Sequence, residues 1–403
     1  MTLSIFEDED VDALEGEEDL DRASADQVRG VSTFTTDWTV ETILSQIDKG
    51  NIMLDPKWQR RDAWNINRKS DLIESVILNY PVPPIVLAET KGQRGKYIVI
   101  DGKQRLLTLR QFSARRGDPL YRPFRLSRLP TLVDIEGATL ESLKELPGYR
   151  PFVDQFENYP IRTVIVRGWG HETILYSIFL RLNAGSAKLH PQELRQALHP
   201  GPFIDFVDEF ASNSQVMRSI LNIKAPDFRM RDNELALRYF AFQNFIQIYD
   251  GNLKSFLDQV VFLLNDDWES WRDDVESQIV EFNTAHDFAV GVFDSTNPYR
   301  KFKGRSYELR LNRAVFDIMM MSFSNPAVRE ELSDRKAEIK KAYENLCTVD
   351  AEFLSSLEST TKSVAATKAR IFKWAQAINI LAGRPLLRPV VSGEALGLGD
   401  GLG

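Results

Sequence analysis

The chain is poor in residues that bind metals or form cross-links. It has one cysteine, Cys347, and four histidines among 403 residues. A single cysteine excludes an intrachain disulfide and a cysteine-based zinc site. No histidine follows His286, so the C-terminal part cannot supply the histidine ligands of a ββα-metal nuclease. There is also no run of about 18 apolar residues and no basic, apolar N-terminus of the signal-peptide kind. We therefore expect a cytoplasmic protein without a membrane partner.

The negative charge of the chain is concentrated near its N-terminus. The formal net charge is −8, and ten acidic residues without a single base lie between Glu7 and Asp21. Without these ten residues the chain would carry +2. Such a segment repels itself and has little to bury, so we predict an acidic disordered tail over residues 1–35. It could serve solubility, or it could occupy a basic groove in place of nucleic acid.

The pattern of apolar residues changes near Pro191. Before this point, helix patterns such as Val40–Lys49 alternate with short strand patterns such as Ile85–Ala88 and Ile161–Val166. We expect Asn67 to cap a further helix. After Pro191, helical periodicity continues to about Ala382. The sequence thus predicts an α+β domain with a small mixed sheet over residues 36–195, an all-α domain over 196–383, and a flexible Gly-rich tail over 384–403.

One short segment predicts a strand, a tight turn and a helix in immediate succession. The β-branched run Tyr97–Asp101 ends in Asp-Gly, and a helical pattern begins at Lys103. Free amides at the start of a helix, with Arg105 close by, favour anion binding. Asp101 could hold a metal ion, orient a water molecule, or cap the helix.

Two further segments are candidates for contacts with phosphate or bases. The first is basic and aromatic and contains Gln59, Arg60, Arg61 and Trp64, which suit phosphate contact and base stacking. It could equally be a surface loop whose tryptophans pack on the core. The second links two helical patterns around Asn183 and resumes at Pro191. By itself it indicates only a helix–turn–helix without a defined purpose.

Taken together and in this order, these segments resemble one protein family. The segments are Pro56–Trp64, Leu72–Ile77 with Pro81–Pro84, Ile100–Arg105, Phe179–Asn183 with Leu189–Arg195, and Arg229–Asp232. They are similar to the N-terminal domain of GmrSD-type modification-dependent restriction endonucleases, over about residues 38–245. The family's Asp-Gly-Gln-Gln-Arg motif corresponds to Asp101–Arg105, with Lys103 in place of the first Gln. This replacement adds a positive charge.

The resemblance implies a ParB/sulfiredoxin-like fold and a nucleotide-triphosphate-binding, hydrolysing component of a DNA-targeting, anti-phage defence system. It implies that Asp101, Gln104 and Arg105 are catalytic, with Asp101 also a ligand of Mg²⁺. The expected sites for phosphate and nucleic acid are Gly102, Lys103, Gln59, Arg60, Arg61 and Asn183 for the nucleotide, and Trp64 and Arg61 for nucleic acid.

Two other functions remain open at this point. The chain could be a non-enzymatic DNA-binding or adaptor subunit that recruits a separate nuclease. It could also cut nucleic acid itself, because Glu89, Asp101 and Lys103 match a loose acid…acid-x-Lys nuclease pattern. We disfavour nuclease activity in this chain alone, since a glycine followed by a helix turns Lys103 away from the face of the strand.

Overall fold

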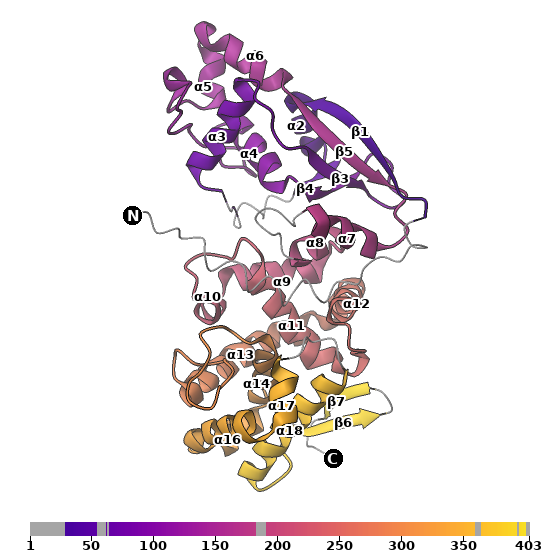
Figure 1. Cartoon of the computed structure of the whole chain (residues 1–403), viewed down its shortest axis with the longest axis vertical. Coiled ribbons are helices and arrows are strands. Elements are labelled where there is room, and N and C mark those ends of the chain that lie inside the picture. Colours follow the sequence, from indigo (N-terminus) through magenta and orange to yellow (C-terminus); the bar gives the residue numbers. More distant parts are fainter. Residues whose placement is uncertain are drawn as a thin grey trace. The chain divides into compact units, whose positions relative to one another are not determined.

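The computed structural model describes residues 29–54, 62, 64–182, 191–358, 364–392 and 395–399. The chain divides into two compact units with the boundary between Leu198 and His199. The first, here called the N-terminal unit, mixes strands and helices, and the second, here called the helical unit, is built mostly of helices (Figure 1). This confirms the predicted α+β class with a mixed sheet followed by helices.

The N-terminal unit contains a five-stranded mixed sheet. Its strand order is β1-β5-β3-β4-β2. The outer strand β1 is antiparallel to β5, and β3 is antiparallel to β4, whereas the pairs β3–β5 and β4–β2 are parallel. The strands are β1 (Ser32–Thr39), β2 (Ile52–Met53), β3 (Ile85–Glu89), β4 (Tyr97–Asp101) and β5 (Pro160–Arg167).

Helices cover both faces of this sheet, because its central strands are apolar on both sides. Ile85 and Leu87 of β3 pack in one core with five helices, namely α2 (Val40–Asp48), α3 (Ile66–Ile77), α4 (Lys103–Ser113), α5 (Leu140–Glu145) and α6 (Arg150–Asn158). Val86 and Ala88 face the opposite core, which is shared with α7 (Glu172–Leu182) and α8 (Pro191–Leu198). Short 3₁₀ turns, η2 (Val133–Ile135) and η3 (Pro147–Tyr149), complete the unit.

Two local features of the N-terminal unit differ from the sequence prediction. Helix α3 is capped by Asn65, whose Oδ1 accepts the Arg68 amide at 3.0 Å, and not by Asn67, which lies within the helix. The prediction for Asn67 is therefore wrong. The N-cap residue of a helix has an extended backbone, as Asn65 has, whereas Asn67 already lies within the helix. In addition, β1 begins at Ser32, inside the segment that we assigned to the tail, because Ser32–Thr39 pairs along its whole length with β5.

The helical unit packs around a large core rich in aromatic residues. Among the described residues, no helix combines the length and the apolar character needed to cross a bilayer. The helices are α9 (Pro202–Asn213), α10 (Gln215–Leu221), α11 (Arg231–Phe245), η4 (Ile246–Ile248), α12 (Leu253–Asp266), α13 (Trp268–Phe293), α14 (Arg313–Phe323), α15 (Pro326–Glu331), α16 (Lys336–Val349), α17 (Ala351–Glu358) and α18 (Val364–Ala382).

The end of the chain departs from the tail that we expected after Arg384. Strands β6 (Arg388–Ser392) and β7 (Ala395–Gly399) form an antiparallel two-stranded sheet. The glycines in this segment weigh against a strand, but pairing with a neighbouring strand overrides such local preferences.

Candidate functional site

The predicted corner between strand and helix is present at the end of β4. Gly102 separates β4 from α4 and has a φ of 98°, in the left-handed region. A Cβ atom at this position would lie only 2.6 Å from Cγ2 of Ile85 on β3. Both the backbone angle and the close approach to β3 therefore require glycine. As a result, the strand turns into the helix within one residue.

The first turn of α4 leaves backbone amides available at the corner. The first backbone hydrogen bond of the helix runs from the Leu106 amide to the Gly102 carbonyl, at 2.9 Å. The amides of Gln104 and Arg105 therefore precede the helical ladder. No side chain of the described residues caps this end of α4, so Asp101 is not the N-cap that one interpretation expected. These amides lie at the positive end of the helix dipole, where an anion is favoured.

Arg105 lies over this corner in a fixed position. Its Nη2 donates to Oδ2 of Asp101 at 2.8 Å and to the carbonyl oxygen of Pro84 at 3.0 Å. The Arg105 side chain is 16% exposed and that of Asp101 is 30% exposed. The Nε atom of Arg105 is buried and has no hydrogen-bond partner among the described residues. One part of the guanidinium is thus held in place while the Nε donor is unsatisfied.

Gln104 presents a second unsatisfied group at the same turn. Its Oε1 is buried without a hydrogen-bond partner in the described part of the chain. A buried polar atom that lacks a partner is costly, and an occupant such as water or a ligand is its usual explanation. Gln104 and Arg105 therefore provide an unsatisfied acceptor and an unsatisfied donor on adjacent residues.

Lys103 differs from what its position in the sequence suggested. Its Nζ lies 3.1 Å from Oε1 of Glu193 in α8, and the two side chains are only 7% and 5% exposed. Glu193 balances the charge that Lys103 adds to the motif. To reach a phosphate with its ammonium group, Lys103 would have to leave this carboxylate.

Two neighbours of Glu193 on α8 are also polar and buried. Gln192 and Arg195 are buried, and Nη1 of Arg195 donates to Oε1 of Gln192 at 2.5 Å. The sequence analysis included Glu193 and Arg195 in a segment of the family resemblance but assigned neither of them to the site. The signal available to it was a cluster of polar residues directly after a helix-initiating proline.

Asp62, near the C-terminal end of the basic segment, is attached to α3 and α4 by hydrogen bonds. Asp62 accepts from Lys69 of α3 and, at 3.1 Å, from Nε2 of Gln111 of α4, while Lys69 also donates to Oε1 of Gln111 at 2.7 Å. On the other side of the segment, the Tyr121 hydroxyl donates to the Leu54 carbonyl at 2.7 Å. These contacts attach both flanks to the body of the unit that contains α4.

Several predicted contact residues lie outside the described residues, namely Gln59, Arg60, Arg61 and Asn183. Trp64 is described. It is half-buried against the core, and the guanidinium of Arg68 lies 4.6 Å from the centre of its ring. Part of the stacking surface expected to meet a nucleic-acid base is therefore covered by Arg68.

The geometry also disfavours the nuclease pattern of Glu89, Asp101 and Lys103. In the ladder between β3 and β4, Asp101 pairs with Val86, whereas Glu89 pairs with Tyr97 at the other end of β4. Four residues of a strand span about 13 Å, which is too far for two carboxylates to share one metal ion. Glu89 is instead engaged by Arg167 at 3.3 Å.

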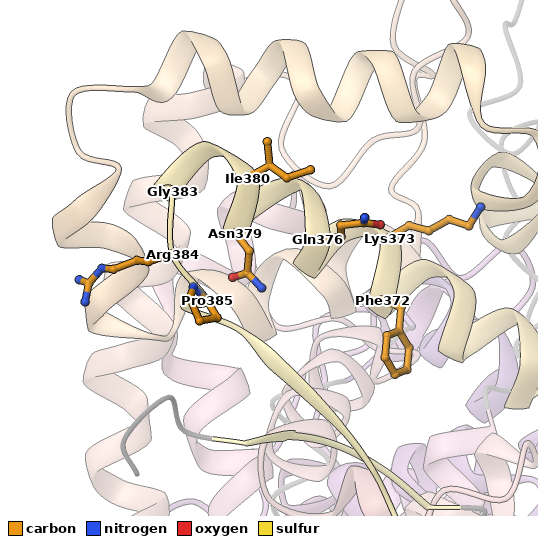
Figure 2. Close-up of a pocket in the computed structure, with 8 residues that line it drawn as sticks. All are labelled: Phe372, Lys373, Gln376, Asn379, Ile380, Gly383, Arg384 and Pro385. Atoms are coloured by element: carbon orange, nitrogen blue, oxygen red, sulfur yellow. The ribbon is translucent and has the colours of Figure 1, made fainter.

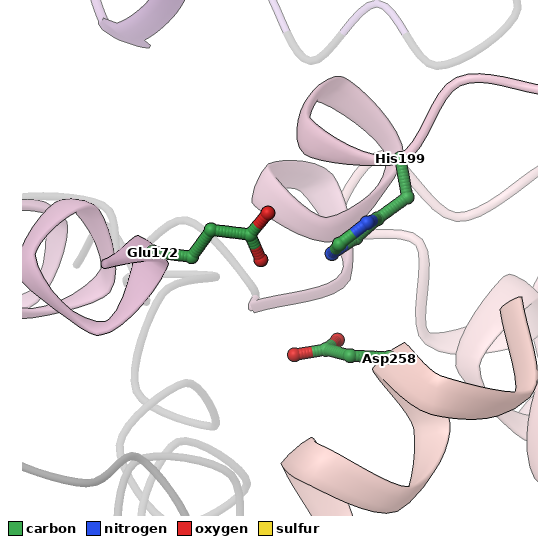
Figure 3. Close-up of side chains that lie close together, drawn as sticks. All are labelled: Glu172, His199 and Asp258. Carbon is green, nitrogen blue, oxygen red and sulfur yellow. The ribbon is translucent and has the colours of Figure 1, made fainter. Parts of the chain in front are cut away.

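Within the described part of the chain, the two histidines of the helical unit, His199 and His286, do not belong to a histidine cluster. His199 and Asp258 have ligand atoms within 4.8 Å of each other (Figure 3). Glu172, also drawn there, belongs to the N-terminal unit and is not counted with them. Two donors are fewer than a structural or catalytic zinc site uses. His286 is buried, and its Nδ1 lies 3.1 Å from the Tyr299 hydroxyl. Burial lowers the pKa of His286, which indicates a neutral residue of the core.

The helical unit also has a groove of about 630 Å³ at the end of α18 (Figure 2). Its two cations are engaged by carboxylates: Lys373 pairs with Asp350 and Glu352, and Arg384 pairs with Glu331. None of the described residues that line this groove has a buried polar atom without a hydrogen-bond partner, in contrast to Arg105 and Gln104.

Comparison with known proteins matches one family model to the N-terminal unit. Residues 40–200 match the model described as "GmrSD restriction endonuclease, N-terminal domain". No curated protein and no solved structure matches the chain. The ParB/sulfiredoxin-like fold that the resemblance implied thus stays a prediction. The match includes the corner, both flanks of the basic segment, and α8, and it indicates a restriction-type defence protein. Residues 40–200 are therefore similar to the N-terminal domain of GmrSD restriction endonucleases, the family to which the order of the sequence motifs pointed.

Proposed function

We propose that this chain is the component of a DNA-targeting restriction system that binds and hydrolyses a nucleotide triphosphate. The observation that carries the proposal is the corner at Gly102. There, the backbone amides of Gln104 and Arg105, the Nε of Arg105 and the Oε1 of Gln104 belong to consecutive residues and lack hydrogen-bond partners within the described part of the chain. Preorganised donors of this kind stabilise the charge on phosphate oxygens during phosphoryl transfer.

Each residue of the corner has a role in the proposal. The amides of α4 and Arg105 bind phosphate oxygens, and Gln104 accepts a hydrogen bond from the nucleotide or from the attacking water. Asp101 orients this water. The water oxygen bonds to the terminal phosphorus, the bond from phosphorus to the bridging oxygen breaks, and the released proton passes to a carboxylate or to solvent. Gln59, Arg60, Arg61 and Asn183 are proposed as further phosphate contacts, and Lys103 would join them only after exchanging Glu193 for phosphate.

Asp101 fits a role in holding Mg²⁺. Its carboxylate is 30% exposed, and Arg105 bonds to Oδ2, whereas Oδ1 accepts no hydrogen bond from the described residues. Magnesium in nucleotide sites commonly takes one or two carboxylates together with phosphate oxygens. When bound, the ion would neutralise charge on the phosphates.

The test is binding of ATP and GTP by calorimetry, together with release of inorganic phosphate, for wild-type protein and Arg105→Met. Loss of a charge-assisted contact of about 1.5–3 kcal/mol should weaken binding about 10–100-fold. Arg115→Met is the matched control, because Arg115 is an exposed arginine shortly after the same helix. If wild-type protein binds neither nucleotide, with or without DNA, the proposal is wrong.

One observation favours a second function, a DNA-binding or adaptor subunit without turnover. Oδ2 of Asp101 is bonded to Arg105, so this oxygen is already occupied and only Oδ1 remains to orient water. In that case the corner would bind a phosphate of the DNA backbone, with Trp64 and Arg61 as further contacts, and a separate nuclease subunit would cut the DNA. DNA binding that weakens with rising salt and is lost in Arg105→Met, without any phosphate release, would support this function.

A further inference from the structure

A loop of the helical unit, fixed by hydrogen bonds and ion pairs, exposes the side chain of Leu309 to solvent. The loop lies between α13 and α14. It folds back on itself through the bridge between Phe302 and Tyr307, and the Glu308 amide donates to the Lys301 carbonyl at 2.9 Å. Lys301 also pairs with Glu308 at 3.0 Å, and the Tyr307 hydroxyl donates to Oε1 of Glu344 on α16 at 2.8 Å. The loop is thus fixed at its base on the helices.

Leu309 follows the bridged pair by two residues and is 88% exposed, more than any other large apolar side chain in the described part of the chain. Arg305 and Arg310 are also exposed, and neither has an ion-pair partner among the described residues. Single exposed apolar residues are common on protein surfaces. Leu309 differs from such residues because its loop is fixed by hydrogen bonds and it lies between two arginines in the sequence. A fixed loop loses little conformational freedom on binding, which favours docking.

The same unit contains a groove whose chemistry complements this loop. The groove has a volume of about 580 Å³ and lies between α9 and α13, beside the start of α10. Its apolar lining consists of Phe206, Phe210, Val216 and Ile279, and Glu209 and Glu276 line it as exposed acids. None of the described residues that line it is cationic. Glu276 has Arg272 at 3.5 Å, and Glu209 has no ion pair within the described part of the chain.

We propose that the Leu309 loop of one copy of this chain docks in the Phe206–Ile279 groove of a second copy. Leu309 would fill the apolar floor, and Arg305 and Arg310 would face Glu209 and Glu276. Charge complementarity of this kind aligns partners and increases the rate at which they meet. Because loop and groove are different surfaces of one unit, two copies can dock reciprocally in a symmetric dimer, or a single contact can repeat head-to-tail into a ring or a filament.

The charge of the groove favours a protein partner over nucleic acid. Two exposed carboxylates line the groove, and none of its described lining residues is cationic. Arg272 pairs with Glu276 alone, so the groove still disfavours a phosphate backbone. The loop, with two arginines around a leucine, matches it in both charge and apolar character. Binding of DNA by the loop is therefore an outcome that would contradict the proposal.

The experiment is sedimentation velocity of the full chain over a range of micromolar concentrations, at low and high salt. Wild-type protein should self-associate, and more weakly at high salt. Leu309→Asp and Ile279→Asp should each weaken self-association at least about tenfold, since each puts a charge where an apolar contact forms. Val349→Asp is the matched control, because Val349 is 73% exposed on α16 and outside both surfaces.

The decisive arm is a mixture of the two defective proteins. Leu309→Asp keeps an intact groove and Ile279→Asp keeps an intact loop, so the mixture should form a heterodimer although neither protein self-associates. A wild-type protein that stays monomeric would overturn the proposal. So would a mixture that forms no complex, or self-association that Val349→Asp weakens as much as Leu309→Asp. Circular dichroism shows whether each variant is folded, and none of these outcomes depends on nucleotide binding.

Discussion

Replacing Gly102 by alanine should destabilise the N-terminal unit far more than the same change at Gly95. Both glycines have a positive φ, 98° at Gly102 and 81° at Gly95. A Cβ at Gly95 would meet nothing within 4 Å, whereas at Gly102 it would lie 2.6 Å from Ile85 Cγ2 and 3.1 Å from Ile85 Cβ. The left-handed backbone costs about 1–2 kcal/mol at either site. Overpacking against the buried Ile85 adds about 1–3 kcal/mol at Gly102 alone.

The expected cost is therefore about 2–5 kcal/mol for Gly102→Ala, against about 1–2 kcal/mol for Gly95→Ala. Hydrogen exchange followed by mass spectrometry can measure this difference locally, through the amides of residues 97–113. Exchange that requires opening of the unit should be faster in Gly102→Ala than in Gly95→Ala by about 5–150-fold. Equal exchange in the two variants would refute the argument that contact with β3 requires glycine at this corner.

Two further predictions concern buried charges. Lys103→Met should destabilise the N-terminal unit by about 3–5 kcal/mol, because Glu193 stays buried and loses the Lys103 cation. The double change of Lys103→Met with Glu193→Leu should be nearly neutral. Thermal unfolding compares the two variants, and equal losses of stability would contradict a buried pair. The free energy of unfolding of the helical unit should fall as the pH drops below the ordinary histidine pKa of 6.5, since burial lowers the pKa of His286 and only the unfolded chain then takes up the proton. Urea unfolding at a series of pH values should show this loss in wild-type protein and a smaller one in His286→Gln, and parallel pH profiles would count against it.

Local signals were enough to predict the corner. The β-branched run before Asp101 predicts a strand, the Asp-Gly pair predicts a turn, and the helical period after Lys103 predicts a helix, and all three are present in this order. The same kind of signal was ambiguous before α3, where Asn65 and Asn67 are both good capping residues. Only the extended backbone at Asn65 decides between them. Local sequence therefore indicates that a helix begins there but does not determine its first residue.

The contacts that position the corner could not be predicted in this way, because they join distant parts of the chain. Glu193 lies 90 positions from Lys103, and Arg105 reaches back 21 positions to the Pro84 carbonyl. A single sequence contains no signal for such pairings. The replacement of glutamine by Lys103 looked like a gain of positive charge for phosphate binding. The fold places a carboxylate beside it, so the added charge is balanced within the protein.

The pairing of Asp101 with Arg105 leads to a final prediction that separates the two proposed functions. Asp101 Oδ2 and a phosphate oxygen would compete for the same Nη2 of Arg105, which now lies 2.8 Å from the carboxylate. Asp101→Asn weakens this competitor, so anion binding at the corner should tighten, by up to about tenfold for one charge-assisted hydrogen bond. For a hydrolase, the same change removes the group that orients water, so phosphate release should be lost. Binding of triphosphate, measured without Mg²⁺ because Asp101 is also the proposed ligand of the ion, should tighten. For an adaptor, DNA binding should tighten and there is no turnover to lose. If Asp101→Asn weakens binding of both triphosphate and DNA, Asp101 is instead needed to hold Arg105 in place, and its proposed role towards water is wrong.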